Sequence, residues 1–550
     1  MTEQKRRQTV TPLDRSLTRR ELLALGAGAA GAFALANPAG ATAAGGYGIP
    51  QCSLRAQATG ELQQGGTLRV AIIGEPPSLA DAMFTTATIT SNVAQQMFEG
   101  LFARNSQFAP SPMLVDQHTI SEDGLTYTFK LRQGISFHNG KPMTATDVVA
   151  SLKRWGSLTG RGRLIFGRLD RIEETDPATV TMTFKQPTGV LLDFLALIEA
   201  FVLPAEIADA AGTEALTAEQ LIGTGPFKFQ EHQVDQYIRL VRYDGYVPRD
   251  DPSDGAAGRK VAYLDQIDFI PVPDASVRAD GLITGEYHFT DTIESDQYEA
   301  IEGDPNLNPV IVKPYYWVSP HFNKRQGLFT DVRLRQAVAL AFSGPEALIS
   351  GFGREEFFRA DPSVAAVETV WHTDVGNEIY LKDDLEQAKA LLSEAGYTGQ
   401  PIRWLTTREY PYNFNIATLV SQRLEQIGMK VELVVSDWAT LVQNRSKPEA
   451  YEIFLTGHSG YSHPATQPFN DKEWPGFWDS AEKDRIVSEM VTEADPERQQ
   501  QLVDQYQQLI YTEMPFVKCG DYFLLRATRA EMQGYVNFPD FFLWNVGLSS

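Results

Sequence analysis

Short runs of alternating apolar and polar residues are spread along this chain, and they predict β-strands. The runs occupy residues 67–73, 125–131, 179–184, 430–435 and 451–456. Successive side chains of a strand point to opposite faces. Each run therefore has an apolar face that must be buried against another part of the chain.

Apolar residues at helical spacing fill the gaps between the later strands. Residues 384–396 place apolar side chains on one face and end at Gly396, a usual helix stop. Two further helices are predicted over residues 416–427 and from Asp437 onward, because aspartate is a good helix cap. The region 378–456 therefore alternates helix and strand three times, which is typical of an α/β lobe with short connections.

The segment 134–149 joins a predicted strand to a predicted helix. Asn139-Gly140 is a tight-turn pair because both residues tolerate positive φ. Either Thr144 or Thr146 can cap the helix that follows. The letters F-H-N-G-K-P-M-T-A-T-D-V in this segment resemble the F-x-N/D-G-x-P-x-T-A-x-D-V block of the peptide/nickel-type (family 5) solute-binding proteins of ABC importers.

Four further segments resemble blocks of that family, in the same order along the chain. Residues 65–79 are similar to its opening G-G-x-L and P-x-x-L-D, and residues 95–101 to a helix that ends in E-G-L. Residues 223–227 match G-T-G-P-F without change, and residues 329–337 resemble P-F-x-D-x-R-V-R-Q-A. The resemblance covers essentially the whole mature chain.

The resemblance implies an α/β fold with two lobes, as in type II periplasmic binding proteins, and an extra subdomain in the first lobe. We expect residues 45–314 and 516–550 to form the first lobe, with its extra subdomain at about 100–215. Residues 315–515 would form the second lobe.

Two crossing strands would act as the hinge between these lobes, and we expect them near residues 313–317 and 515–518. A solute that contacts both lobes would stabilise the closed form. The membrane permease would then recognise that form.

The first 44 residues have the features of an export signal. Arg19-Arg20 precedes an Ala/Gly-rich apolar run from Leu22 to Ala36, which is shorter than the about 20 residues of a membrane span. We interpret residues 1–44 as a twin-arginine signal, with an ordinary secretory signal as the alternative. Cys52 follows a glutamine rather than a small residue, so we expect no lipid anchor and a location in the periplasm of a Gram-negative cell.

The net charge and the cysteine content limit the kinds of partner and of disulfide that this protein can have. The first 44 residues carry six basic and three acidic residues, so the net charge of −22 leaves about −25 on the rest. Such acidity argues against binding to nucleic acid or to an anionic membrane. An oxidising compartment would permit a disulfide between Cys52 and Cys519, although the sequence does not establish one.

The carboxylate-binding stretch of the family is altered here. Dipeptide binders of the family carry W-x-M-x-x-x-R-P-Y, whose arginine pairs with the peptide carboxylate. Residues 404–412 place Tyr410 at that position, with Arg408 two residues earlier. Since the two residues share a face of an extended segment, Arg408 either replaces the missing arginine or forms a surface salt bridge.

The ammonium-binding stretch is altered as well. The same binders carry G-W-x-G-D-x-x-D-P, but residues 457–464 contain no carboxylate and place His463 before the proline. A buried ammonium without a counter-charge is costly, so a peptide ligand would need another acid, such as Glu75 or Glu409. His458 and His463 either contact nickel or a chelated metal, which imidazole suits, or hydrogen-bond an organic solute or the loop itself.

Aromatic side chains complete the candidate ligand site. We expect pocket walls from Trp317, Tyr410, Trp438 and Tyr461, and we assign no catalytic residue, cofactor or metal ligand. The chain lacks H-E-x-x-H and G-x-x-x-x-G-K, and its G-H-S-G-Y only approaches the G-x-S-x-G elbow.

We therefore predict a non-catalytic, monomeric binding protein. It would capture a peptide-like or other small organic solute and deliver it to ABC permease subunits in the inner membrane. Binding of nickel or of a metal chelate is the alternative hypothesis. A secreted hydrolase is a third hypothesis, which the sequence favours less.

Overall fold

The computed structural model describes residues 62–380 and 382–549. The predicted signal at 1–44 and Cys52 lie outside the described residues. Within them, Cys519 is buried and forms no disulfide with another described residue.

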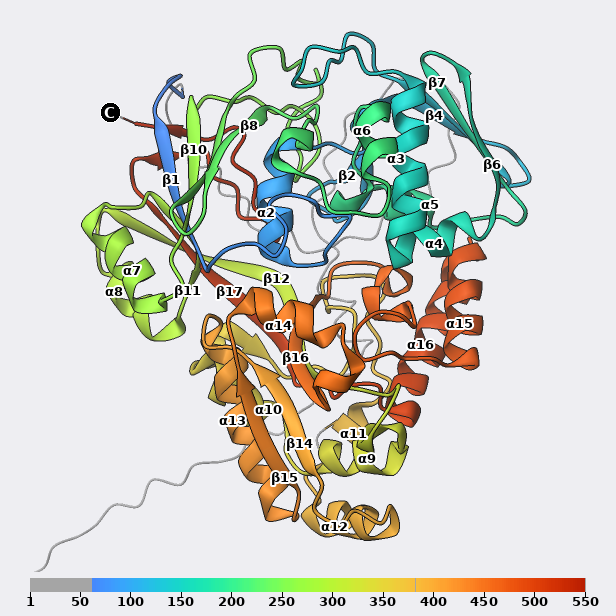
Figure 1. The fold of residues 1–550 in the computed structure, drawn as a ribbon, viewed down its shortest axis with the longest axis vertical. Helices are drawn as coiled ribbons and strands as arrows, with labels where there is room; N and C mark the ends of the chain where they lie inside the picture. Colours follow the sequence, from blue (N-terminus) through green and yellow to red (C-terminus); the bar gives the residue numbers. More distant parts are fainter. Residues whose placement is uncertain (1–61, 381, 550) are drawn as a thin grey trace, which may run out of the picture. The chain divides into compact units, whose positions relative to one another are not determined.

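One eleven-stranded sheet runs through the fold (Figure 1). Ten strands follow each other in the order β15 (Lys430–Val435), β14 (Pro401–Thr406), β16 (Ile453–Ser459), β12 (Leu307–Phe322), β17 (Gly520–Arg529), β11 (Phe289–Ile293), β1 (Thr67–Ile72), β10 (Gln266–Pro271), β9 (Tyr237–Arg242) and β8 (Phe227–Gln233), while β13 (Phe358–Arg359) pairs with β17. The sheet is mixed: β14 runs parallel to β15 and β16, whereas β12 runs antiparallel to β16 and β17.

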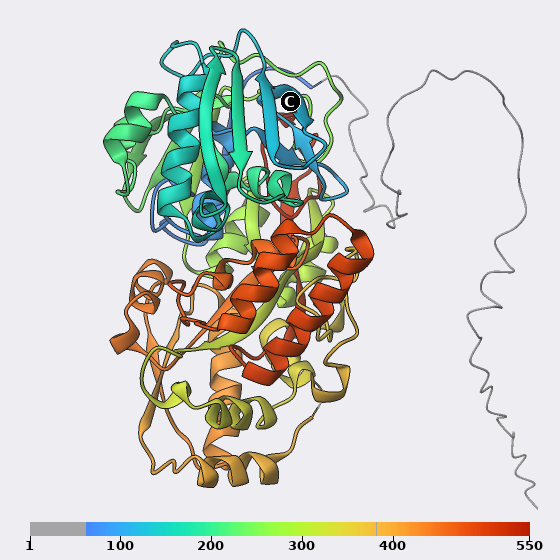
Figure 2. The same cartoon turned by 90° about the vertical axis from the view of Figure 1, so that its right-hand side faces the viewer.

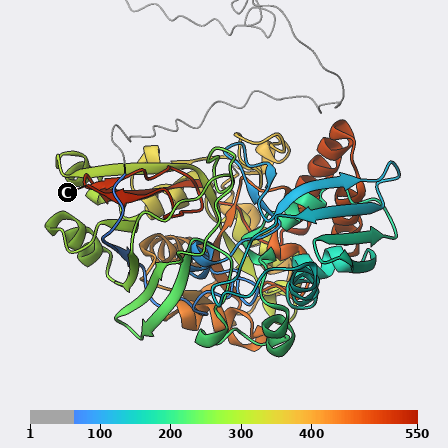
Figure 3. The same cartoon turned by 90° about the horizontal axis from the view of Figure 1, so that it is seen from above.

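The 16-residue strand β12 connects the two halves of this sheet. Its first part pairs only with β17, and its later part, from Tyr316 to Phe322, also pairs with β16. Figure 3 shows β12 and β17 side by side along much of their length. The predicted crossing segment 313–317 therefore lies within β12. The second one differs, because Pro515 has no N–H to donate, Phe516 forms only a bridge to His321, and regular pairing of β17 begins at Gly520.

A separate four-stranded antiparallel sheet is formed by an early part of the chain. Its order is β4 (Val115–Ile120), β5 (Thr126–Leu131), β7 (Thr179–Phe184) and β6 (Leu169–Asp176). Helices α3 (Ala145–Leu158) and α4 (Gly160–Phe166) lie beside this sheet (Figure 2). This sheet falls inside the range that the sequence suggests for an extra subdomain.

The remaining elements are mostly short. The other helices are α2 (Thr88–Met97), α5 (Leu191–Leu195), α6 (Ala205–Ala211), α7 (Ala275–Thr284), α8 (Tyr298–Glu302), α9 (Val332–Leu340), α10 (Gly344–Phe352), α11 (Asn377–Tyr380), α12 (Leu385–Glu394), α13 (Pro411–Gln426), α14 (Trp438–Arg445), α15 (Ala481–Thr492) and α16 (Pro496–Glu513). Two small sheets pair β2 (Phe102–Arg104) with β3 (Pro110–Pro112) and β18 (Met532–Gln533) with β19 (Gly547–Leu548).

Most of the predicted elements form at or near their predicted bounds. The strand over residues 430–435 and the helix capped by Asp384 are confirmed. Helix α13 begins at Pro411, earlier than predicted, because proline is favourable in the first turn of a helix. The strand predicted at 451–456 is β16, Ile453–Ser459, so residues 457–459 belong to a strand and not to a loop.

The apolar side chains form two large buried clusters. One gathers around β1, the four-stranded sheet and α15–α16, and the other gathers around α9, α10, α13 and β14. The fold therefore has two main apolar cores, and the first of them also takes in α15 and α16. Every helix in the described part of the chain is too short or too polar to span a bilayer.

Candidate functional site

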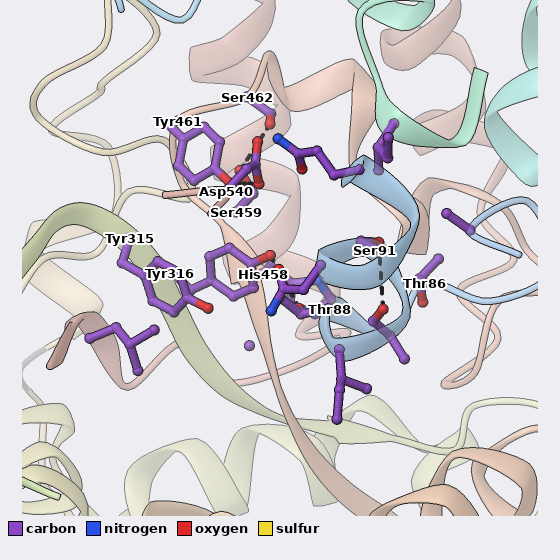
Figure 4. A pocket seen from close by; sticks show the side chains of 18 of the residues that line it. Thr86, Thr88, Ser91, Tyr315, Tyr316, His458, Ser459, Tyr461, Ser462 and Asp540 are labelled. Atoms are coloured by element: carbon purple, nitrogen blue, oxygen red, sulfur yellow. Dashed lines mark hydrogen bonds between the residues drawn. The ribbon is translucent and has the colours of Figure 1, made fainter. Parts of the chain in front are cut away.

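A cavity lies between segments from both halves of the fold (Figure 4). On one side, α2 and the segment before it contribute Thr86, Thr88 and Ser91, and on the other β12 and β16 contribute Tyr316 and His458. Its volume, measured as space for the centres of water molecules, is about 220 Å³. A single water needs about 10–15 Å³ on that scale, so an organic solute the size of a short peptide fits.

Tyrosine rings form one wall of this cavity. Tyr315 and Tyr316 stack with ring centroids 4.3 Å apart, and Tyr412 lies 5.3 Å from Tyr522. Tyr410 meets Trp438 edge to face at 5.0 Å. Such a wall offers broad apolar faces with hydroxyl groups at the rim, which suits a solute with both apolar and polar parts.

An acidic group reaches the cavity from the C-terminal segment. The Tyr461 hydroxyl donates to Asp540 Oδ1 over 2.9 Å, as Figure 4 shows. Arg104 lies 3.9 Å from the other Asp540 oxygen and donates to Ser462 Oγ over 2.8 Å. The Asp540 side chain is 29% exposed, so a solute can reach its carboxylate.

Two further acids in the lining are neutralised by basic partners. Glu99 and Lys260 are both buried and form an ion pair of 3.1 Å. Glu199 pairs with Arg161, which also donates to the Thr466 carbonyl. Because these charges are already matched, they shape the cavity but offer little net charge to a solute.

Asp291 and Glu294 line the cavity without an ion pair among the described residues. Burial raises the pKa of Asp291 to about 6, partly opposed by Arg278 and Arg526. Burial likewise raises the pKa of Glu294 to about 7, partly opposed by Arg278. Asp291 Oδ1 is buried and has no hydrogen-bond partner. These two carboxyl groups are therefore more easily protonated than ordinary acids.

The two imidazoles of His321 and His458 face each other in the sheet. Their Nε2 atoms are 2.8 Å apart, so one ring donates to the other. Burial holds the pKa of both well below the usual range, and for His458 the charge of Arg445 lowers it further. Both rings are therefore neutral at neutral pH, and His458 adds no charge to the cavity lining.

The structure brings half of the sequence-predicted ligand residues to the cavity. Tyr410, Trp438, His458 and Tyr461 all line it. They come from three places: the start of α13, the start of α14, and β16 with the turn after it. Their shared position is a consequence of the sheet, because β14 and β16 are neighbours and end near the same edge.

The other four predicted residues lie outside the cavity lining. Glu75 accepts from the Asp235 N–H over 2.7 Å and lies 3.3 Å from His232. Trp317 is fully buried against Phe516. Arg408 and His463 stand in the two stretches that resemble the ligand-binding blocks of the family.

Arg408 and His463 have local partners. Arg408 is exposed, and its guanidinium stacks on the Phe414 ring at 3.7 Å. His463 is buried, its Nδ1 accepts from the Ala465 N–H over 3.0 Å, and its Nε2 lies 3.3 Å from Gln499. Burial lowers the pKa of His463 to about 4. Both side chains therefore stabilise their own surroundings.

Several charged groups of the cavity were missed by sequence reasoning, namely Arg104, Asp291, Glu294, Arg445 and Asp540. Most stand in segments with no recognisable pattern. Arg445 is the exception, because it lies seven residues after Trp438 on α14. Residues seven apart share a helix face, so this spacing was a usable signal.

The described residues bring few metal-binding side chains together. Among residues 62–380 and 382–549, no three His, Cys, Asp or Glu side chains come together in a way that could hold a metal ion. The histidine pair contributes only two nitrogens, and they hydrogen-bond each other.

Comparison with known proteins gives the same picture over most of the chain. Residues 109–472 match the model of the bacterial extracellular solute-binding proteins, family 5 Middle. The probable peptide ABC transporter periplasmic-binding protein y4tO of Sinorhizobium fredii is 30% identical over 499 residues, 87% of this chain and 93% of its own. The glutathione-binding protein GsiB of Escherichia coli O1:K1 / APEC is 26% identical over 501 residues, 86% of this chain and 92% of its own.

A solved structure extends the comparison to the fold. The periplasmic binding protein DppA from Helicobacter pylori, in complex with the peptide STSA, superposes with a TM-score of 0.77 at 21% identity and covers 89% of this chain and 99% of its own. The mixed sheet and the two cores of this chain fit a two-lobed periplasmic binding protein. This chain belongs to family 5 of the bacterial extracellular solute-binding proteins and acts as the substrate-binding component of an ABC transporter.

Proposed function

We propose that the protein captures a peptide-like solute in the cavity described above and passes it to its permease. The observation that carries the proposal is the cavity itself, which is lined from both halves of the fold and holds both apolar walls and unmatched charges. Relatives named for peptide and glutathione binding support this class of solute. Tyr410, Trp438, His458 and Tyr461 are proposed to contact the solute.

Asp540 supplies the acid that the 457–464 stretch lacks. It lies beside Tyr461 in the cavity, and its side chain is 29% exposed. An amino group of the solute would displace water and pair with this carboxylate. The distant Arg104 leaves enough negative charge for that pairing, since their closest approach is 3.9 Å.

The remaining features of the proposal concern location and assembly. Residues 45–314 with 516–550 would form one lobe, residues 315–515 the other, and β12 with β17 the hinge. Residues 1–44 would direct twin-arginine export to a Gram-negative periplasm, where the protein works as a monomer without an anchor. A fusion of residues 1–44 to a reporter, exported only in cells with the twin-arginine pathway and lost on changing Arg19-Arg20 to Lys-Lys, tests the route.

A hydrolytic role is disfavoured by the surroundings of Ser459. Its hydroxyl lies 2.9 Å from Ser462 Oγ, and the neighbouring His458 is bonded to His321 instead. A serine nucleophile needs a base within hydrogen-bond reach, and Ser462 is not a base. Turnover of chromogenic esters by the purified protein, lost on Ser459→Ala, would overturn the assignment.

Calorimetry tests the solute class. The protein is unfolded, dialysed and refolded to remove any bound solute, then titrated with the peptide Ser-Thr-Ser-Ala and with glutathione. Saturable binding of either at one per chain supports the proposal. Absence of heat with both, in a protein whose refolding is verified by circular dichroism, contradicts a peptide-like solute.

A further inference from the structure

Arg445 is a buried cation without an anionic partner. It is the last residue of α14, is 4% exposed and lines the cavity. No carboxylate among the described residues forms an ion pair with it. Its Nη2 donates a long hydrogen bond of 3.4 Å to the Thr86 hydroxyl, and its Nε has no hydrogen-bond partner among the described residues.

The other buried arginines of the described chain are better satisfied. Arg154 pairs with Asp81 over 2.7 Å. Arg278, Arg335 and Arg526 have no ion pair, but each donates to two or more backbone carbonyls. Arg445 donates to no carbonyl. A buried charge without a partner lowers the stability of the fold. The presence of Arg445 therefore needs an explanation other than stability.

Aromatic rings surround this guanidinium. Its central carbon lies 5.5 Å from the Trp474 ring, 5.8 Å from Phe454 and 5.9 Å from Trp438. The faces of these rings compensate part of the charge, and they keep the group away from bulk water. An anion that reached Arg445 would therefore pair with it in a site of low dielectric, where the attraction is strong.

The neighbouring cations do not compete for the same anion. Lys260, Arg161, Arg104 and Arg526 also line the cavity. Lys260 and Arg161 each pair with a buried acid, Arg104 lies 3.9 Å from Asp540, and Arg526 donates to the Phe538 and Pro539 carbonyls. Among these lining cations, Arg445 is the one with neither an acid nor a backbone carbonyl as its partner. Its planar guanidinium matches the two oxygens of a carboxylate. A dianion such as a phosphate monoester would need a second free cation.

We propose that Arg445 binds a carboxylate of the transported solute, and that Trp438 and Trp474 hold the apolar or flat group next to it. This assignment rests on the proposed function. It adds one requirement to the class of solutes: the transported solute is an organic carboxylate. The carboxylate receptor thus lies on α14, away from the 404–412 stretch. Burial lowers the pKa of Arg445 to about 10, which still leaves it charged at neutral pH.

The test uses the full mature chain, freed of solute, and two minimal probes. Benzoate carries a carboxylate on a flat ring, and benzamide has the same shape without the charge. Benzoate should raise the melting temperature of the wild type and benzamide should not. In Arg445→Met the affinity for benzoate should fall at least tenfold, and in Arg445→Lys by an intermediate factor, because lysine keeps the charge but lacks the fork.

A second readout needs no ligand. Arg445→Met should raise the melting temperature of the solute-free protein, because it replaces an unmatched charge by an apolar side chain. Arg161→Met is the matched contrast: it should lower the melting temperature, because it leaves the buried Glu199 without its partner. If Arg445 serves only to hold the aromatic cluster together, Arg445→Met will lower the melting temperature as Arg161→Met does.

The following results overturn the assignment: no effect of benzoate on the wild type, equal effects of benzoate and benzamide, a lower melting temperature for Arg445→Met, or tighter binding of phenyl phosphate than of benzoate. Failure of the proposed function looks different. If Ser-Thr-Ser-Ala binds the wild type and Arg445→Met alike, the function stands and the role of Arg445 is refuted. If benzoate behaves as expected but no peptide binds, the peptide-like solute class fails and Arg445 keeps its role.

Discussion

Tyr461 and Asp540 meet in the cavity although 79 residues separate them in the chain. The tyrosine stands in the stretch where peptide binders of the family carry their acid, and it donates to an acid from elsewhere. A carboxylate that accepts one hydrogen bond keeps lone pairs free for a second donor. The pair therefore restores, from two segments, a charge that one segment lacks.

Asp540→Asn should weaken binding of solutes with a free amino group by about 10–100-fold, because a hydrogen bond to a charged group is worth about 1.5–3 kcal/mol. Calorimetry with Ser-Thr-Ser-Ala measures this loss. N-acetylated Ser-Thr-Ser-Ala is the control, since it should bind the variant and the wild type with similar affinity. Equal loss for both peptides would mean that Asp540 supports the fold instead of the amino group.

The raised pKa of Glu294 predicts a pH dependence of stability. Its folded pKa of about 7 exceeds the unfolded value of about 4.5, so the folded protein binds the extra proton between these values. Stability is therefore greatest below about pH 4.5 as far as this group is concerned, and falls as the pH rises towards 7. Glu294→Gln should flatten that fall in the solute-free protein.

The measurement is the urea midpoint of wild type and Glu294→Gln from pH 4.5 to 8. The curves should converge at the acid end and separate in favour of the variant at pH 8. Glu346→Gln serves as a control, because Glu346 pairs with Arg423 on the surface and should lose a little stability. A Glu294→Gln protein that is less stable than wild type at pH 8 would contradict the account.

At the scale of single elements, the start of α3 depends on one buried carboxylate. Asp147 Oδ2 accepts from both the N–H and the hydroxyl of Thr144 over 2.9 Å, and Oδ1 accepts from the Ala205 N–H over 2.8 Å and from Lys141 over 2.9 Å. It therefore joins two helices, α3 and α6, and sets where α3 begins. The sequence left Thr144 and Thr146 open as caps, and the structure places Thr144 at the N-cap.

Asp147→Ala should lower the free energy of unfolding by about 3 kcal/mol, because it leaves several buried donors unpaired. Chemical denaturation followed by circular dichroism measures the change. Thr146→Ala is the matched control: its exposed side chain bonds only Glu174, so the change should stay within about 0.5 kcal/mol. Similar losses for the two variants would contradict the assigned cap.

Elements could be predicted from the sequence far better than the site. The strand 179–184 and the helix after Asp384 follow from alternation, helical spacing and caps, all of which act between near neighbours. The cavity depends on segments that the long strand β12 brings together. No local sequence pattern predicts that Asp540 or Asp291 lines it. Asp291 lies in β11, which is buried on both faces and so shows no alternation.

Arg408 and His463 show that a residue in a stretch resembling a ligand-binding block of the family need not line the pocket. Each stands near a position where relatives carry ligand charge, yet Arg408 stacks on Phe414 and His463 caps a short helical turn. Once the charges of those stretches are lost, the residues that remain there can satisfy local needs. The charged groups that we propose to contact the solute come instead from α14 and the C-terminal segment.

At the scale of the molecule, solute binding should be coupled to closure of the two lobes. Several contacts already join the two sides of the cavity, among them Thr88 to Tyr316 at 3.3 Å and Arg104 to Ser462 at 2.8 Å. A solute that contacts both sides adds to these and favours the closed form. The bound protein should therefore be more compact and more stable than the solute-free one.

Small-angle X-ray scattering and thermal unfolding should report this coupling together. At a free solute concentration of 100 Kd, binding adds about 2.7 kcal/mol of stability, and the radius of gyration should decrease. Trp438→Ala, which removes a cavity wall, should lose both effects at the same concentration. An unchanged radius of gyration with a clear thermal shift would mean that the solute binds without lobe closure.

The most direct test of the account is native mass spectrometry of the protein isolated, without unfolding, from cells that make it. The account predicts one small organic solute per chain, released at low collision energy and carrying a carboxylate, and its loss from the Arg445→Met protein. A folded wild-type protein that shows only the mass of its polypeptide after incubation with a peptide digest would contradict the central claim.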